Sequence, residues 1–61
     1  SFPIDVIYMN RENQVIGLDR EMKPWRVGKV HWRARSVIEL PAGTLQRTGT
    51  SVGDRLSIQE I

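Results

Sequence analysis

Short runs of apolar residues alternate with polar positions along this chain, and the first two runs predict a β-hairpin. Residues 2–9 are dense in β-branched and aromatic side chains, with mostly apolar positions on both faces of the expected strand. A polar turn at residues 10–13 separates them from a second strand at residues 14–18. Residues 14–23 are expected to form one strand that continues, with a bend, into a loop. We expect Asn10 or Asn13 to take the left-handed conformation in this turn, and Gly17 to mark a bulge or a close contact.

The run from residue 36 to residue 58 predicts a strand, a short helix and a return strand. In the third expected strand, residues 35–40, the alternation puts Glu39 on the face opposite Ile38. Pro41 suits a first helical turn, and a helix is predicted near residues 42–48, ending at Gly49 in the left-handed C′ position. A turn then leads into a fourth strand. The expected fold class is therefore mainly β, a small α+β domain with a partly open, barrel-like antiparallel sheet of about four strands.

The length of the chain limits how stable it can be alone. Its 61 residues make one domain at most, near the lower limit for a hydrophobic core. There is no cysteine for a disulfide and one histidine for a metal site, so association with a second copy or with a missing part of the polypeptide is the remaining route. The chain starts with Ser1 rather than methionine, and we expect residues 1–61 to be a fragment of a larger domain. No apolar stretch approaches the roughly 20 residues of a membrane span.

Positive charge is concentrated between Met22 and Ile38. This segment carries +5, and the remainder carries −3, because the net charge is +2. Such a segment can contact phosphates, anionic lipid or an acidic protein face, although a solvated basic edge that discourages strand aggregation is the simpler interpretation. The interleaved tryptophans resemble the stacking side chains of single-strand binders, but core or rim packing is their more frequent role. The candidate binding surface consists of Lys23, Arg26, Lys29, His31, Trp32 and Arg33.

The acidic residues offer one candidate catalytic pair. Asp5 and Glu39 come from neighbouring apolar strands, and hydrolysis by paired carboxylates needs two such groups close together in a cleft. Arg35 can equally neutralise either carboxylate, and a buried ion pair is the preferred interpretation. His31 has no second histidine, cysteine or serine at motif spacing, so neither a metal site nor a catalytic triad is expected. The sequence shows no catalytic set and no need for a cofactor.

Five segments carry a family resemblance in their order along the chain: Pro3-Ile4-Asp5-Val6-Ile7-Tyr8, Gln14-Val15-Ile16, Lys23-Pro24-Trp25, residues 34–44 and Gly53-Asp54. Together they resemble the carboxy-terminal half of domain-of-unknown-function family 192. The resemblance implies a mostly β fold in a largely bacterial and archaeal family without an established activity. It allows export to the cell envelope, although this chain shows no signal peptide. The candidate functional or structural positions are Asp5, Trp25, Arg35, Glu39, Gly43, Gly53 and Asp54.

Two further features of the resemblance affect the interpretation. Family members usually carry an earlier half, with a Gly-Leu-Met segment and an aromatic-Trp-Met strand, and this half is missing here. Self-association is one way to cover the edge that its absence exposes. A second, shorter similarity covers Leu40 to Ile58, which resembles the swapped-hairpin modules of antitoxin-type transcription regulators that bind DNA as interleaved dimers.

Three hypotheses for function follow. The leading one is a small β-rich binding or interaction module without catalysis, so an enzyme is not favoured. The second is nucleic-acid binding through the basic segment 23–35, which is not favoured either. The third is part of an enzyme or ligand site that the missing N-terminal half completes.

Overall fold

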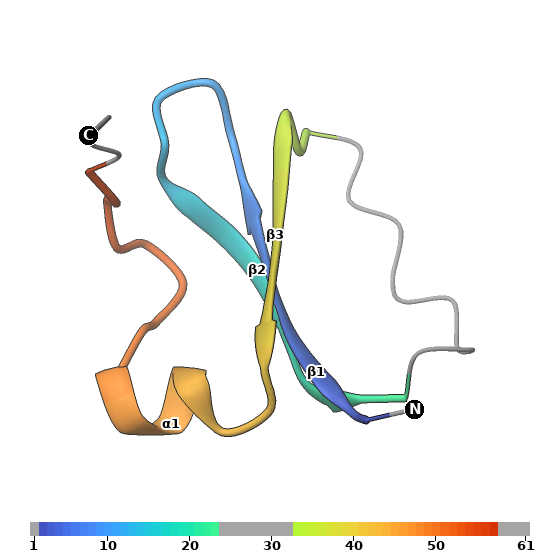
Figure 1. Ribbon diagram of the computed structural model, residues 1–61. Helices are drawn as coiled ribbons and strands as arrows, with labels where there is room; N and C mark the ends of the chain where they lie inside the picture. Colours follow the sequence, from blue (N-terminus) through green and yellow to red (C-terminus); the bar gives the residue numbers. More distant parts are fainter. Residues whose placement is uncertain (1, 24–32, 58–61) are drawn as a thin grey trace.

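A three-stranded antiparallel sheet and one short helix make up the fold (Figure 1). The computed structural model describes residues 2–23 and 33–57, and its elements are β1 (Ile4–Met9), β2 (Val15–Met22), β3 (Ser36–Pro41) and α1 (Thr44–Thr48). The strand order is β2-β1-β3, so β1 is central. The predicted mainly β fold is confirmed. In the described residues the sheet is open and has three strands, and the expected fourth strand is represented by a single bridge between Gln14 and Arg55.

Two asparagines close the hairpin between β1 and β2. The Oδ1 atom of Asn10 accepts hydrogen bonds from the backbone amides of Glu12 and Gln14, at 3.0 and 2.9 Å. Asn13 has a φ of 60°, a left-handed conformation that asparagine tolerates because its short side chain can hydrogen-bond locally. Of the two asparagines predicted to take this conformation, the structure assigns it to Asn13.

Irregular pairing bends β2 at two places. The register with β1 shifts between Tyr8 and Met9, where Gly17 lies opposite Tyr8, as the glycine led us to expect. A second shift lies opposite Asp5, where β2 has one more residue than β1 and Glu21 has a φ of 52°. This second shift has the features of a β-bulge, which bends a strand and turns its backbone amides towards new partners.

The helix is shorter than the sequence predicted. Pro41 is the last residue of β3 rather than part of a first helical turn, and α1 begins at Thr44 instead of residue 42. Gly43 precedes the helix with a φ of 92°, a left-handed backbone that cannot continue a right-handed helix. The predicted left-handed Gly49 at the end of the helix is confirmed, with a φ of 68°.

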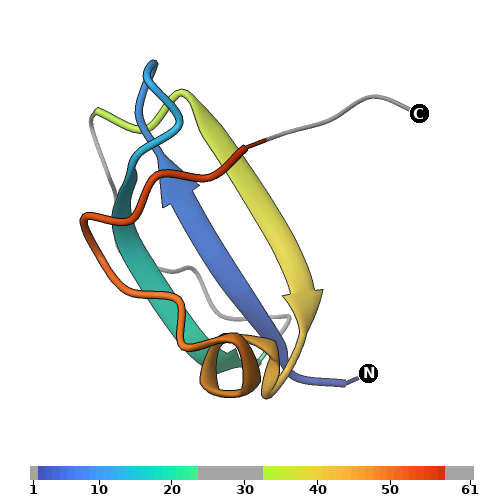
Figure 2. The same ribbon diagram turned by 90° about the vertical axis from the view of Figure 1, so that its left-hand side faces the viewer.

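The core lies between one face of the sheet and a cover formed by α1 and residues 50–57, which Figure 2 shows in front of the strands. Residues 53–55 run beside the start of β2, where the amide of Val15 donates to the carbonyl of Asp54 at 2.7 Å and the amide of Gly53 donates to the carbonyl of Val15 at 2.8 Å. The buried cluster contains Ile7, Met9, Val15 and Leu45, with Leu18, Ile38, Leu40 and Leu56 packed against it. Within residues 2–23 and 33–57, no helix has the length and apolarity that crossing a membrane requires.

Candidate functional site

Asp5 is the buried charged side chain of the described residues, with 1% of its surface exposed. Its Oδ1 accepts a hydrogen bond from the amide of Glu21 in the β2 bulge, and its Oδ2 accepts one from the amide of Leu45 in α1, both at 2.9 Å. One carboxylate on the central strand therefore connects the neighbouring strand to the helix. We call Asp5 and these two amides the Asp5 brace.

The surroundings of Asp5 keep its carboxylate ionised. Burial acts to raise the pKa because it disfavours the charged form, but backbone hydrogen bonds from Leu45, Glu21 and Gly43 and the positive charge of Arg20 act to lower it. The net result is a pKa below the ordinary aspartate value of 3.8. A crevice of about 20 Å³, lined by Asp5, Arg20, Glu21, Gly43 and Gln46, adjoins the carboxylate.

The structure does not bring Asp5 and Glu39 together. Asp5 is paired with Leu40, whereas Glu39 is paired with Val6. Because neighbouring residues of a strand point to opposite faces, the two carboxylates lie on opposite sides of the sheet. The geometry of paired-carboxylate hydrolysis is therefore not present.

The sequence left open whether Arg35 pairs with Asp5 or with Glu39, and the ion pair with Asp5 is not formed. The backbone amide of Arg35 donates to the carbonyl of Met9 at 2.7 Å, which places Arg35 at the far end of β1 from Asp5. The hydrogen bonds to the Asp5 carboxylate come instead from the backbone amides of the Asp5 brace. The sequence indicated a charged side chain as the partner of Asp5. Backbone amides are present at nearly every residue, so no residue type in the sequence marks them as the donors.

The other motif positions shape the backbone. Gly43 and Gly53 have φ values of 92° and 99°, in a region that L side chains rarely adopt. The Oδ2 atom of Asp54 accepts a hydrogen bond from the amide of Ser51 at 2.9 Å, which closes the turn before the chain meets β2. These three residues therefore position the cover over the core. Trp25 lies outside the described residues.

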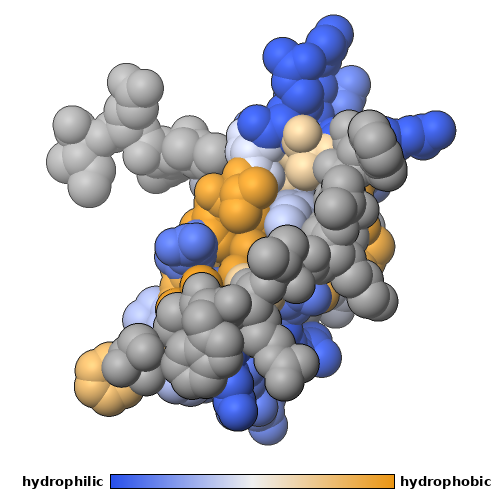
Figure 3. Space-filling model, turned by 90° about the vertical axis from the view of Figure 1, so that its right-hand side faces the viewer, coloured by the Kyte–Doolittle hydropathy of each residue, from blue (hydrophilic) through white to orange (hydrophobic). Residues whose placement is uncertain are grey.

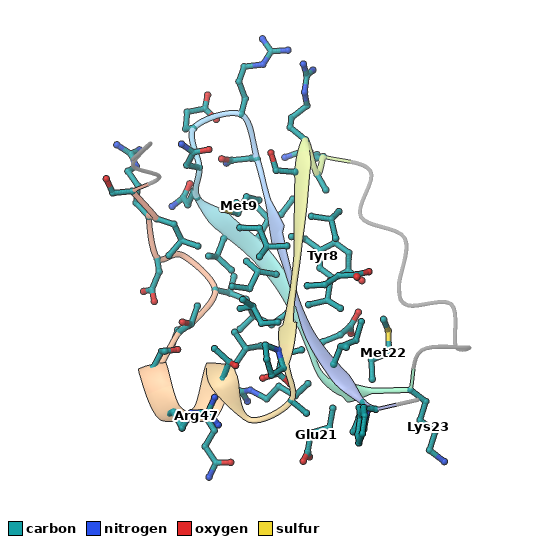
Figure 4. All side chains as sticks on the ribbon, in the orientation of Figure 1. Tyr8, Met9, Glu21, Met22, Lys23 and Arg47 are labelled. Carbon is teal, nitrogen blue, oxygen red and sulfur yellow. The ribbon has the colours of Figure 1, made fainter. Side chains whose placement is uncertain are left out.

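The predicted basic surface is described only at its ends. Lys23 follows β2 and lies at the same end of the sheet as Glu21 and Met22 (Figure 4). Arg33 precedes β3, whose start is paired with the end of β1. Lys23 and Arg33 are both exposed and lie at opposite ends of the sheet. The remaining positions of this surface, Arg26, Lys29, His31 and Trp32, lie outside the described residues.

A hydrogen bond that sequence reasoning missed joins Tyr8 to Asp19. The phenol of Tyr8 donates to Oδ2 of Asp19 at 2.7 Å, on the face of the sheet opposite Met9 (Figure 4). Burial of the phenol, then the hydrogen bond to Asp19 and the negative charge of its carboxylate, raise the pKa of Tyr8 to about 12. The alternation of the strand places Tyr8 on this face, but the sequence does not specify which residue of β2 lies within its reach.

The titration of Tyr8 tests this contact directly, because Tyr8 is the only tyrosine in the chain. We expect its phenolate absorbance to rise with a midpoint near pH 12 instead of the ordinary 10. Since the folded pKa is the higher one, the stabilisation from this contact is complete below pH 10 and is lost as the pH rises towards 12.

Two variants and a parallel measurement control that titration. Asp19→Asn should move the midpoint back towards 10, whereas Glu39→Gln, which removes a carboxylate from the same face, should leave it in place. Circular dichroism at each pH reports whether the chain is still folded. A midpoint near 10 in the folded parent chain would contradict the assignment.

An apolar groove of about 660 Å³ lies at the start of β1 and the end of β3. One of its exposed side chains is Phe2, at 87%. Among the described strands, β3 is an edge of the sheet, so this groove adjoins a strand edge. The lining residues are Phe2, Pro3, Ile4, Glu39, Leu40, Pro41 and Ala42.

These features define a mainly β fold in which a buried carboxylate braces three elements and an apolar groove adjoins an edge strand. Within the described residues, no group of three His, Cys, Asp or Glu side chains is arranged to hold a metal ion. The chain belongs to the DUF192 family, described as Uncharacterized ACR, whose family model matches residues 1–58. The family resemblance predicted from the sequence is thus confirmed.

A UPF0127 protein of the archaeon Pyrococcus furiosus is similar to this chain, with 38% identity over 53 residues. The matched part covers 87% of this chain and 45% of that relative, so the chain spans less than half the length of the protein it matches. No solved structure matches the chain. The local similarity of residues 40–58 to swapped-hairpin modules stays a prediction.

Proposed function

We propose that this chain is an interaction module without catalysis, whose apolar groove receives an extended segment of the family domain from outside residues 1–61. The observation that carries the proposal is the groove of about 660 Å³ beside the edge strand β3. An edge strand offers unpaired backbone groups to an added strand, and a neighbouring apolar groove accepts its alternate side chains.

The length of the relative supports this choice of occupant. The chain corresponds to 45% of the Pyrococcus furiosus protein, so more than half of that protein has no counterpart here. The resemblance of this chain to a carboxy-terminal half would place the additional segment ahead of Phe2. Since Phe2, Pro3 and Ile4 line the groove, a preceding segment would be tethered beside it. Such a tether raises the effective concentration to about the millimolar range for a short flexible link.

The exposed side chains around β3 fit the same occupant. Val37 is 56% exposed and lies on the face of β3 that points away from the core cluster. Glu39, which lines the groove, lies on the same face. Scattered apolar residues on a surface are normal, but an apolar groove next to an exposed valine and an exposed phenylalanine is a surface that a partner can cover.

Co-expression tests the proposal. The 61-residue chain, carrying an affinity tag, is expressed together with the part of the Pyrococcus furiosus relative that lies outside the matched 53 residues. We expect the two to co-purify in a one-to-one ratio. Phe2→Ser should weaken the complex about tenfold or more, because burying a phenylalanine contributes roughly 1.5–3 kcal/mol.

A matched substitution elsewhere controls for lost hydrophobicity. Val52 is 62% exposed in the turn that follows α1 and does not line the groove, so Val52→Ser should leave the complex intact. Failure of the two parts to associate, or equal weakening by both substitutions, would overturn the proposal. Sedimentation that shows a dimer of the tagged chain alone, abolished by Phe2→Ser, would assign the groove to a second copy instead and would also overturn it.

A further inference from the structure

Four exposed arginines lie at one end of the sheet, the end at which the hairpin loop joins β1 to β2. Arg11 is in that loop, and Arg35 is next to it, because its backbone amide donates to the carbonyl of Met9 at 2.7 Å. Arg33 is two residues before Arg35, and Arg55 forms a bridge with Gln14 at the other side of the loop. We call these four residues the arginine row: Arg11, Arg33, Arg35 and Arg55.

The backbone pairing sets the width of the row. Four stretches of backbone lie side by side at this end of the sheet: Arg55, then residue 14, then residues 9–11, then Arg35. Three inter-strand spacings therefore separate Arg55 from Arg35. With neighbouring strands about 4.8 Å apart, the row is roughly 15 Å wide. Figure 3 shows hydrophilic side chains gathered at this upper end of the molecule.

The charge of the row is only partly balanced. Glu12 and Asp54 are the acidic residues in the same segments, which leaves an excess of +2 at this end. Asp54 is already engaged, because its Oδ2 accepts a hydrogen bond from the amide of Ser51. In residues 2–23 and 33–57, the structure gives none of the four guanidinium groups a hydrogen bond or an ion pair. Their donors are therefore available to a ligand.

We infer that the arginine row binds the phosphate backbone of nucleic acid. All four cations are arginines, whose planar fork matches phosphate oxygens in a bidentate manner and is less strongly hydrated than an ammonium group. Contacts to phosphate oxygens carry no sequence information directly, so we expect binding that is independent of sequence. This surface shares Arg33 and Arg35 with the basic segment expected from the sequence. It adds Arg11 and Arg55 and leaves out Lys23, which is at the opposite end of the sheet.

Fluorescence anisotropy with a labelled duplex DNA of 20 base pairs tests the inference. Each phosphate that a side chain neutralises contributes about −0.9 to the slope of log affinity against log salt. Four contacts predict a slope of about −3.6, equivalent to roughly a hundredfold loss of affinity between 50 and 200 mM salt. The double variant Arg11→Gln/Arg35→Gln should reduce that loss to about tenfold.

Arg47→Gln is the matched control. Arg47 is an exposed arginine in α1, at the opposite end of the molecule from the hairpin loop (Figure 4). This variant should keep at least three quarters of the parent slope, and circular dichroism should show that all variants are folded. No binding at 20 mM salt, or an equal reduction by Arg47→Gln and by Arg35→Gln alone, would overturn the inference. Tighter binding to polyglutamate than to DNA, dependent on the same arginines, would assign the row to an acidic protein and overturn it as well.

Discussion

Replacing Asp5 with alanine is expected to leave this domain largely unfolded at neutral pH. The substitution removes the acceptor for the amides of Glu21 and Leu45, which lie in different elements. A buried donor left without a partner costs about 1–3 kcal/mol. The hydrogen bond from Leu45 is buried and the one from Glu21 is part-buried, so the two together cost up to about 6 kcal/mol. A domain of 61 residues has about 3–9 kcal/mol of total stability at roughly 0.05–0.15 kcal/mol per residue. The loss is therefore comparable to the whole.

Urea denaturation followed by circular dichroism measures this effect. Glu39→Ala is the control, because Glu39 is an exposed carboxylate on the same pair of strands and its loss should change the free energy of unfolding by about 0.5 kcal/mol or less. Equal denaturation midpoints for Asp5→Ala and the parent chain would show that the Asp5 brace is not structural.

Acid provides a second readout of the Asp5 brace in the parent chain. Because the folded pKa of Asp5 is lower than its ordinary 3.8, its stabilisation is fully present above that pH. It is lost as the pH falls through the folded pKa. We expect the free energy of unfolding to decrease below about pH 4, and the amide of Leu45 to lose hydrogen-exchange protection over the same interval.

Leu45→Ala is expected to have the second-largest effect, a loss of about 2–5 kcal/mol. Leu45 is the buried residue of α1, with none of its side chain exposed, and it packs in the cluster with Ile7, Met9 and Val15. Truncation leaves a cavity beneath a helix of five residues, which is too short to be stable without this contact.

A thermal melt compares Leu45→Ala with Val52→Ala. Both substitutions remove apolar side-chain atoms from the cover of the sheet, but Val52 is 62% exposed and its loss should change the melting temperature little. Similar melting temperatures for the two variants would mean that α1 contributes little to the core.

The sequence correctly predicted those features that depend on a single strand or a single turn. The period of two in residues 35–40 correctly placed Glu39 on the face opposite Ile38, because that relation depends on the strand alone. Gly49 was correctly placed at the end of the helix, since its left-handed backbone is a requirement of the turn itself. The helix start was misplaced because Pro41 is compatible both with the end of an edge strand and with a helix beginning.

Relations between strands were not available from the same patterns. Asp5 and Glu39 were paired as candidates because both lie in apolar strands. Their register pairs Asp5 with Leu40, so Glu39 is offset from Asp5 by one position and points to the opposite face. The left-handed conformation of Glu21 could not be predicted from the sequence either. Glutamate has no preference for that region, and the bulge arises only when Asp5 and the amide of Glu21 meet across the sheet.

The central position of β1 has a consequence for synthesis on the ribosome. β1 precedes the strands on both of its sides, and β3 begins 27 residues after β1 ends. At a synthesis rate of about 5–20 residues per second, β3 is completed on the order of seconds after β1. During that interval an apolar strand with one unpaired edge is exposed to other nascent chains, so the position of β1 in the middle of the sheet exposes this chain to premature aggregation.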